Sequence, residues 1–241
     1  MSTLKVHNIE PATGTDVALG AAGDSITVSG DSLKLNTFKD AGGNTLFTSD
    51  GAGTVSSVNS GLKGAGPILI TTNSFTGASS SSFTSGIDST YDKYMFVLTD
   101  INPGTDTASL GVQFNASGQS GFNEAMTTTF WYNQHSENDS TAYDEYDASL
   151  DQSSGTAYQG ITRQMGGDAD ESSAGIVYLY NPASTSLVKH FQSRMNSYHS
   201  SIYSMDFFVA GFVNVTAAIT QIDFKPSSGV FDGKIKMYGI G

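Results

Sequence analysis

Period-two alternation of apolar residues constrains this chain more than any other feature of its sequence. Residues 94–98 place Tyr94, Phe96 and Leu98 on one face of an expected strand, and residues 110–114 repeat the alternation. An Asn-Pro-Gly sequence at 102–104 separates the two runs and is typical of a turn. The stretch therefore predicts an antiparallel β-hairpin whose aromatic face lies in a hydrophobic core.

The same alternation recurs between Pro67 and the end of the chain, and no helical period competes with it. Further strands are expected at residues 68–75, 82–87, 124–134, 175–180, 187–198, 206–215, 218–224 and 233–240. Short strands separated by Gly, Pro and Asn turns are typical of all-β architectures. We therefore expect residues 67–241 to form an antiparallel, jelly-roll-like β-sandwich.

Residues 1–66 differ in kind from the rest. Of 14 Phe, 11 Tyr and 1 Trp, only Phe38 and Phe47 lie in this segment, so it cannot build a core of its own. Yet Gly-Asp-Ser-Ile at 23–26 is followed by Gly-Asp-Ser-Leu at 30–33, which indicates short repeated strands. Such strands are expected to pack against copies of the same chain around a threefold axis. A disordered Gly/Ser-rich linker is the alternative, and residues 56–66 have that composition.

Composition excludes several classes of protein. A net charge of −12 argues against nucleic acid and against anionic membrane surfaces, both of which attract Lys and Arg. The absence of Cys removes disulfide, thiolate and zinc–cysteine chemistry. The N-terminus lacks a secretory signal pattern, and the longest apolar run, residues 207–212, is too short for membrane insertion.

One short motif imitates a catalytic sequence. Gly30-Asp31-Ser32-Leu33 spells the nucleophile block of a hydrolase class that also requires an Asp three residues before a His. None of the four His residues has that Asp, and the motif lies inside the N-terminal repeat. We interpret it as a turn between strands, expect no catalytic residue, and do not expect an enzyme.

The most irregular stretch, residues 136–172, is acidic and carries several Tyr residues. Its carboxylates could ligate calcium, or two of them could act as the acid and base of a glycosidase. The twelve-residue spacing of a helix-loop-helix calcium site is absent. We therefore expect a solvated loop at a sandwich rim, with no bound metal and no cofactor.

Aromatic and amide side chains near this loop suggest a sugar-stacking surface. Phe130 and Tyr132 alternate with Trp131, so they are expected in the core while Trp131 points outward. Aromatic rings stack on the apolar faces of sugars, and amides bond their hydroxyl groups. The residues predicted to bind a receptor or glycan are Trp131, Asn133, Gln134, Tyr143, Tyr146 and Tyr158.

Two groups of residues together resemble a phage family. The first runs from Gly23-Asp24-Ser25-Ile26 through Leu33-Lys34-Leu35 to Ser49-Asp50-Gly51; the second comprises Tyr91-Asp92, Ile101-Asn102-Pro103, Tyr178-Leu179-Tyr180-Asn181-Pro182 and Met237-Tyr238-Gly239-Ile240. Together they resemble tail-fibre-like virion structural proteins of marine bacteriophages of the cyanophage or pelagiphage type. The resemblance carries over no catalytic residue.

The resemblance implies a homotrimeric protein on the outside of the virion, on tail or capsid, assembled in the host cytoplasm. Residues 1–66 would then anchor the protein to other virion proteins and hold the trimer together. Residues 67–241 would form the tip that contacts a host cell-surface receptor, with polysaccharide as one candidate. A capsid decoration protein that stabilises the shell is the alternative, and a glycan depolymerase is a less favoured one.

Overall fold

A computed structural model describes residues 37–40, 42–49, 51–52, 55–56 and 66–241. The chain divides into two compact units, Met1–Lys63 and Gly64–Gly241, which we describe separately. Within the described residues every paired strand is antiparallel and no helix occurs, which confirms the all-β class. None of these residues therefore belongs to a helix that could cross a membrane.

The described part of the N-terminal unit is a three-stranded sheet. Its strands are β1 (Thr37–Lys39), β2 (Thr45–Ser49) and β3 (Val55–Ser56), in the order β1-β2-β3. Between β1 and β2, the Asp40 carboxylate accepts a hydrogen bond from the Asn44 backbone N–H at 2.8 Å. Gly43 adopts a φ of 81°, which glycine tolerates best, so the sequence Asp-Ala-Gly-Gly-Asn fixes the turn.

The two aromatic residues of this unit meet across the β1–β2 pair. The rings of Phe38 and Phe47 stack with centroids 5.3 Å apart, and their residues are Cα partners. The predicted short strands are thus confirmed between residues 37 and 56. The Gly-Asp-Ser repeat at 23–35 and residues 57–65 of the predicted linker at 56–66 lie outside the described residues, whereas Ser56 ends β3.

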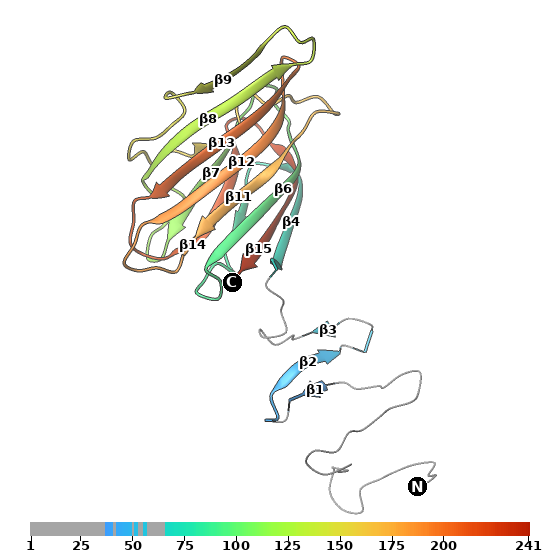
Figure 1. Ribbon diagram of the computed structural model, residues 1–241, viewed down its shortest axis with the longest axis vertical. Helices are drawn as coiled ribbons and strands as arrows, with labels where there is room; N and C mark the ends of the chain where they lie inside the picture. The colour runs from blue at the N-terminus through green and yellow to red at the C-terminus, as the bar shows by residue number, and fades with distance from the viewer. Residues whose placement is uncertain (1–36, 41, 50, 53–54, 57–65) are drawn as a thin grey trace, which may run out of the picture. The chain divides into compact units, whose positions relative to one another are not determined.

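The C-terminal unit contains two antiparallel sheets that face each other as in a sandwich (Figure 1). The eight-stranded sheet has the order β4 (Ile68–Ala78), β15 (Phe231–Ile240), β6 (Lys93–Pro103), β11 (Ser173–Tyr180), β12 (Lys189–His199), β13 (Tyr203–Val213), β8 (Met126–Ser136) and β9 (Ala142–Tyr146). The four-stranded sheet has the order β10 (Gln159–Gly160), β7 (Leu110–Ala116), β14 (Ile219–Pro226) and β5 (Ser81–Phe83).

Aromatic side chains join the two sheets. The rings of Phe96 on β6 and Phe224 on β14 lie 5.7 Å apart, and those of Phe114 on β7 and Phe191 on β12 lie 5.1 Å apart. All four side chains are fully buried. Each ring removes roughly 150–250 Å² from water, so these contacts contribute much of the core. The predicted burial of the Tyr94, Phe96 and Leu98 face is confirmed.

The predicted hairpin at residues 91–114 is wrong. β6 pairs with β15 and β11, whereas β7 pairs with β14 and β10, so the two strands lie in different sheets. The Gly104 N–H donates to the Val230 carbonyl at 2.8 Å. This bond extends the pairing of β6 with β15 by one residue and does not close a turn toward β7. The connection after Gly104 carries the chain from the eight-stranded sheet to the four-stranded sheet. β6 and β7 each bury an apolar face in the core.

The acidic stretch 136–172 is more ordered than expected. It contains β9, which pairs with β8, and the short β10, which pairs with β7. The side chains of Asp147 and Arg163 form an ion pair at 3.0 Å within this stretch. The remaining predicted strands all occur, with shifts of a few residues at their ends.

Candidate functional site

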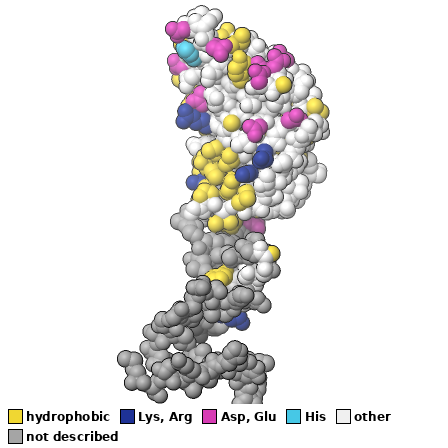
Figure 2. All heavy atoms as spheres, turned by 90° about the vertical axis from the view of Figure 1, so that its right-hand side faces the viewer, with side chains coloured by type: hydrophobic (Ala, Val, Ile, Leu, Met, Phe, Trp, Pro, Cys, Tyr) yellow, Lys and Arg dark blue, Asp and Glu magenta, His cyan; other side chains and the backbone are white. Residues whose placement is uncertain are grey.

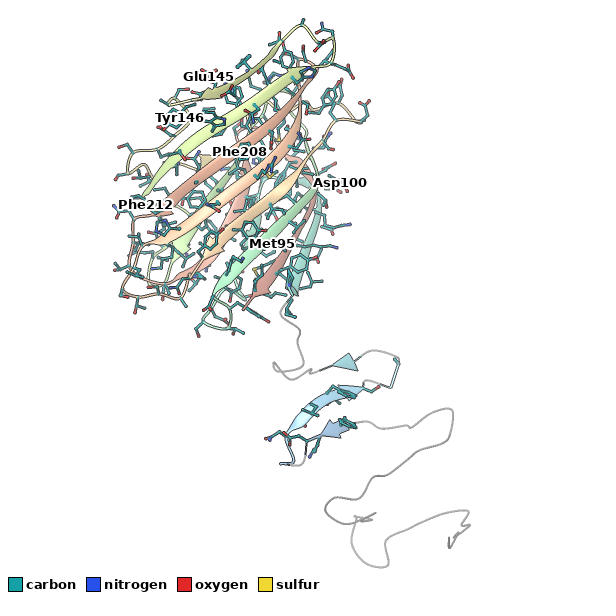
Figure 3. The ribbon with its side chains drawn as sticks, in the orientation of Figure 1. Met95, Asp100, Glu145, Tyr146, Phe208 and Phe212 are labelled. Carbon is teal, nitrogen blue, oxygen red and sulfur yellow. The ribbon has the colours of Figure 1, made fainter. Side chains whose placement is uncertain are left out.

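The outer face of the eight-stranded sheet, turned away from the four-stranded sheet, is unusually aromatic. On β8, Trp131 is 43% exposed while its neighbours Phe130 and Tyr132 are buried, as the sequence predicted. On β13, Phe208 is exposed between the buried Phe207 and Val209. Figure 3 shows this face toward the viewer, with labelled side chains contributed by several of its strands.

A row of outward side chains crosses the sheet at right angles to the strands. Tyr146 of β9 is the Cα partner of Trp131, which in turn faces Phe208 of β13. Phe208 faces Arg194 of β12, and Arg194 faces Ile176 of β11. Because neighbouring strands lie about 4.8 Å apart, the three aromatic residues form a continuous ridge roughly 10 Å long.

A groove lies beside this ridge and also crosses the strands. Its floor is the next outward row, Thr129, Ala210 and Gln192, which are Cα partners across β8, β13 and β12. Two hollows of about 370 and 410 Å³ share these three residues, so they form one groove. We call this surface the transverse groove.

A second ridge borders the transverse groove on its other side. Phe212 and His190 are Cα partners whose rings lie 6.2 Å apart, and Tyr180 continues the lining. The ridges are four residues apart along each strand, or about 13 Å at 3.3 Å per residue. At the groove's end, Tyr180 donates from its hydroxyl group to Gln192 Oε1 at 2.9 Å.

Two cations lie over aromatic rings beside the transverse groove, one of them the Lys93 ammonium at 5.3 Å from the Tyr178 ring centroid. Arg194 donates to Asp206 at 2.9 Å, and its guanidinium lies 4.8 Å from the Phe208 ring centroid. The hydrogen bond with Asp206 raises the pKa of Arg194 further above its usual value. The groove therefore offers aromatic faces, hydroxyl and amide groups, one cation paired with Asp206 and a second cation over Tyr178, a set of groups suited to a polar ligand with apolar faces.

The predicted binding residues are divided by the structure. Trp131, Asn133 and Tyr146 lie on the outer face, where Trp131 and Tyr146 are partners. Gln134 and its partner Tyr143 alternate to the opposite face of β8 and β9. The Tyr143 ring lies 6.0 Å from the ring of the buried Tyr132. Only the first three can contribute to one outer surface.

Tyr158 is far from this surface in the fold. It precedes β10 and lines a hollow on the four-stranded sheet, where its hydroxyl group donates to Asp223 at 2.7 Å. Burial and then the hydrogen bond to Asp223 raise the pKa of Tyr158. The Lys225 ammonium lies 5.6 Å from its ring centroid. The expectation that Tyr158 joins Trp131 in one site is therefore wrong.

Several groove residues were missed by the sequence interpretation. Phe208, Phe212, Tyr178 and Arg194 were not predicted to bind anything, although the signal was present. The stretches 176–180 and 207–212 are apolar at consecutive positions rather than at alternate ones. A continuous apolar run indicates a strand with apolar groups on both faces, and one of those faces is here the outer surface.

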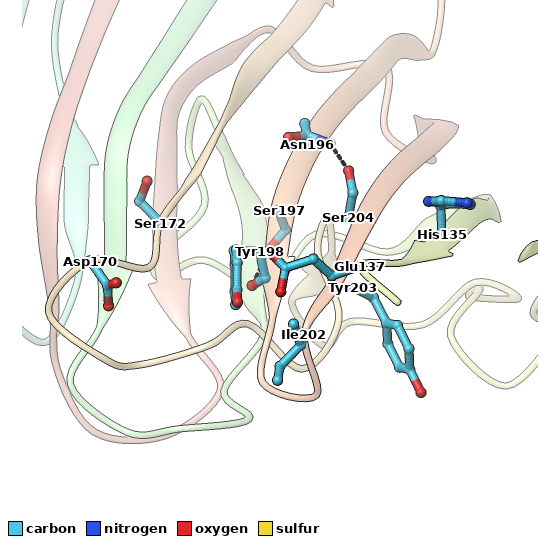
Figure 4. Close-up of a pocket in the computed structure, with 10 residues that line it drawn as sticks. All are labelled: His135, Glu137, Asp170, Ser172, Asn196, Ser197, Tyr198, Ile202, Tyr203 and Ser204. Atoms are coloured by element: carbon cyan, nitrogen blue, oxygen red, sulfur yellow. Dashed lines mark hydrogen bonds between the residues drawn. The ribbon is translucent and has the colours of Figure 1, made fainter. Parts of the chain in front are cut away.

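A separate hollow, of about 350 Å³, lies at the rim of the sandwich (Figure 4). Glu137, Asp170 and Tyr198 line it, together with Ile202 and His135. Burial and then the carboxylates of Glu137, Glu171, Asp170 and Asp168 raise the pKa of Tyr198. Across the described part of the chain, no three His, Asp or Glu side chains are placed to hold a metal ion.

Two of the carboxylates considered for glycoside cleavage, Glu145 and Asp147, are engaged in other contacts. Glu145 accepts a hydrogen bond from the Tyr132 hydroxyl group at 2.6 Å. Asp147 pairs with Arg163 at 3.0 Å and accepts bonds from Ser149. The Ser149 hydrogen bonds, aided by Arg163, lower the pKa of Asp147, whereas a general acid needs a raised one.

Comparison with known proteins gave no match to a family model, to a curated protein or to a solved structure.

Proposed function

We propose that this protein is a structural component of a bacteriophage particle, a short tail fibre or spike that contacts the host surface. In this proposal residues 1–66 form a repetitive β shaft that trimerises and docks on other virion proteins. The jelly-roll-like unit at 67–241 is the tip. The family resemblance, the coreless and repetitive N-terminal sequence and the all-β C-terminal unit support it.

The transverse groove is the observation that carries the host-contact role. Two ridges with aromatic side chains flank a floor of Thr129, Ala210 and Gln192 on an open sheet face. Sugar rings have apolar faces that stack on aromatic rings, while their hydroxyl groups bond amides and hydroxyls. A glycan chain lying across the strands would meet both kinds of group, with Trp131 as the most exposed of the Phe, Tyr and Trp rings that line the groove.

Binding to glycans of the host surface tests this role. We expect the full chain to bind such glycans on an array, and Trp131→Ala to weaken binding about tenfold, because loss of one stacked ring removes about 1.4 kcal/mol. Val230→Ala is the matched control, since Val230 is 41% exposed and lies outside the groove. Equal binding by both variants would remove the groove from the proposal.

Position on the particle tests the virion role. Antibody labelling of phage particles in electron microscopy is expected to mark the tail. Regular labelling over the capsid shell would replace the fibre with a decoration protein, and absence of the chain from purified particles would refute both.

A depolymerase would cleave the glycan that it binds. The structural contacts of Glu145 and Asp147 favour a binding protein, so we expect no release of shorter glycans after long incubation. Cleavage that disappears in Glu145→Gln or Asp147→Asn would instead establish the enzyme.

A further inference from the structure

The four edges of the two sheets differ in how they are protected. In the four-stranded sheet, the edge strands β10 and β5 have only two and three residues. In the eight-stranded sheet, β9 has five residues, including Asp144 and Glu145. β4 has eleven residues and no charged side chain. Short or charged edges discourage pairing with another chain, so β4 alone has the properties of an edge that meets a partner.

β4 is open along one side in the described part of the chain. It pairs with β15 on its other side, and no backbone hydrogen bond joins it to another described segment. Leu69 is 51% exposed, and Thr71 and Thr72 are also exposed. An exposed leucine on an uncharged edge strand costs solubility unless another surface covers it.

The adjoining outer face extends this apolar surface. Leu69 is the Cα partner of Tyr238 on β15, and Tyr238 is the partner of Met95 on β6. Lys93 and Lys236 border this row on the same two strands. Figure 2, which faces the β4 side, shows hydrophobic side chains gathered in a patch with Lys and Arg side chains beside it.

We infer that β4 and the Leu69–Tyr238–Met95 row form a contact surface for further copies of this chain. Connectivity favours this occupant, a step that rests on the proposed trimer. β4 is the first strand after residues 1–66, so copies joined through that segment would bring their β4 strands together.

The size of the surface suits a tethered contact. Eleven residues span about 36 Å, and the two strand spacings from β4 to β6 span about 10 Å, which gives roughly 350 Å². A standard stable interface buries about 800 Å² on each partner. A surface of this size gains from a tether that raises the effective concentration of the partner, which residues 1–66 would supply.

Cross-linking tests the inference directly, because the chain has no Cys. The full-length variants Leu69→Cys and Thr71→Cys, each treated with a short bismaleimide at low protein concentration, are expected to yield covalently linked chains on denaturing gels. Ile202→Cys is the control, because Ile202 is 51% exposed, as Leu69 is, and lies in the turn between β12 and β13, with three strands between β12 and β4 in the sheet order. We expect the β4 variants to cross-link at least tenfold faster than the control.

Rates at Leu69→Cys and Thr71→Cys no higher than at Ile202→Cys would overturn the inference. That result is distinguishable from failure of the proposed function, because glycan binding by the wild-type chain and its position on the particle are measured separately. Sedimentation of Leu69→Lys gives an independent reading: a charge on the edge is expected to shift the chain toward smaller species, and an unchanged distribution would also count against the contact.

Discussion

A buried lysine gives the sharpest stability prediction. Lys189 on β12 is fully buried, and its ammonium donates to the carbonyls of Val215, Thr216 and Ala217 at 3.2, 2.6 and 2.5 Å. Each hydrogen bond from a charged donor contributes about 1.5–3 kcal/mol, a gross sum of about 4.5–9 kcal/mol. Lys189→Met keeps the shape of the side chain, removes these bonds and also removes the desolvation of the charge, which costs several kcal/mol.

We expect Lys189→Met to lower the free energy of unfolding by about 2–4 kcal/mol, because the three loop carbonyls lose their donor and regain water only in part. Urea unfolding followed by fluorescence measures the change. Lys225→Met is the control, since this exposed lysine contacts only the Tyr158 ring, a contact that contributes less than about 1 kcal/mol. Equal unfolding free energies for Lys189→Met and the wild type would refute this prediction.

The pH dependence of the unfolding free energy, compared between the wild type and Lys189→Met, provides a second check. Burial lowers the pKa of Lys189 below its usual value of 10.5, with Glu124 acting in the opposite direction. The unfolded chain therefore binds more protons between the lowered pKa and 10.5, and wild-type stability rises with pH in that window. Lys189→Met lacks this rise, so the difference in unfolding free energy between the two proteins should grow as the pH increases.

Three further outcomes follow from individual contacts. Gly175→Val should lower the unfolding free energy by about 3 kcal/mol in urea titrations, because its Cβ would meet the Arg194 carbonyl, and wild-type stability would contradict this. Tyr132→Phe removes the hydrogen bond to Glu145, so amides of β9 should exchange faster with deuterium while those of β12 keep their rates. Because the pKa of Asp147 is lowered in the folded chain, its carboxylate stabilises the fold fully above pH 3.8, and this stabilisation is lost as the pH falls from 3.8 through the lowered pKa. Asp147→Asn should therefore flatten the decrease of the thermal unfolding temperature at acid pH.

Local burial was predictable from the sequence, and pairing was not. Alternation alone placed Phe96 and Phe130 in the core and Trp131 outside, because side-chain direction in a strand depends only on position along it. The hairpin prediction failed because sheet membership depends on distant partners. Gly104 bonds Val230, a residue that no local pattern connects with it.

The candidate site was predictable only in part for the same reason. Trp131 and Asn133 share a strand face, so their common direction could be read from spacing. Tyr158 could not be placed, because the irregular stretch before it sets its position beside Asp223. Phe208 was readable in principle, since consecutive apolar residues indicate two apolar faces, but the sequence does not say which of these faces stays open.

The pairing of β4 with β15 has a consequence for biosynthesis. The first strand of the C-terminal unit pairs with its last, so that Ile68 faces Gly239. β4 is the first strand of this unit to leave the ribosome and its partner β15 is the last strand of the unit to do so, and such distant pairings close slowly. A chain interrupted before residue 231 would leave β4 without its partner β15 and one side of β6 unpaired. The fold thereby discriminates against unfinished copies, which would lack the ordered β4 strand.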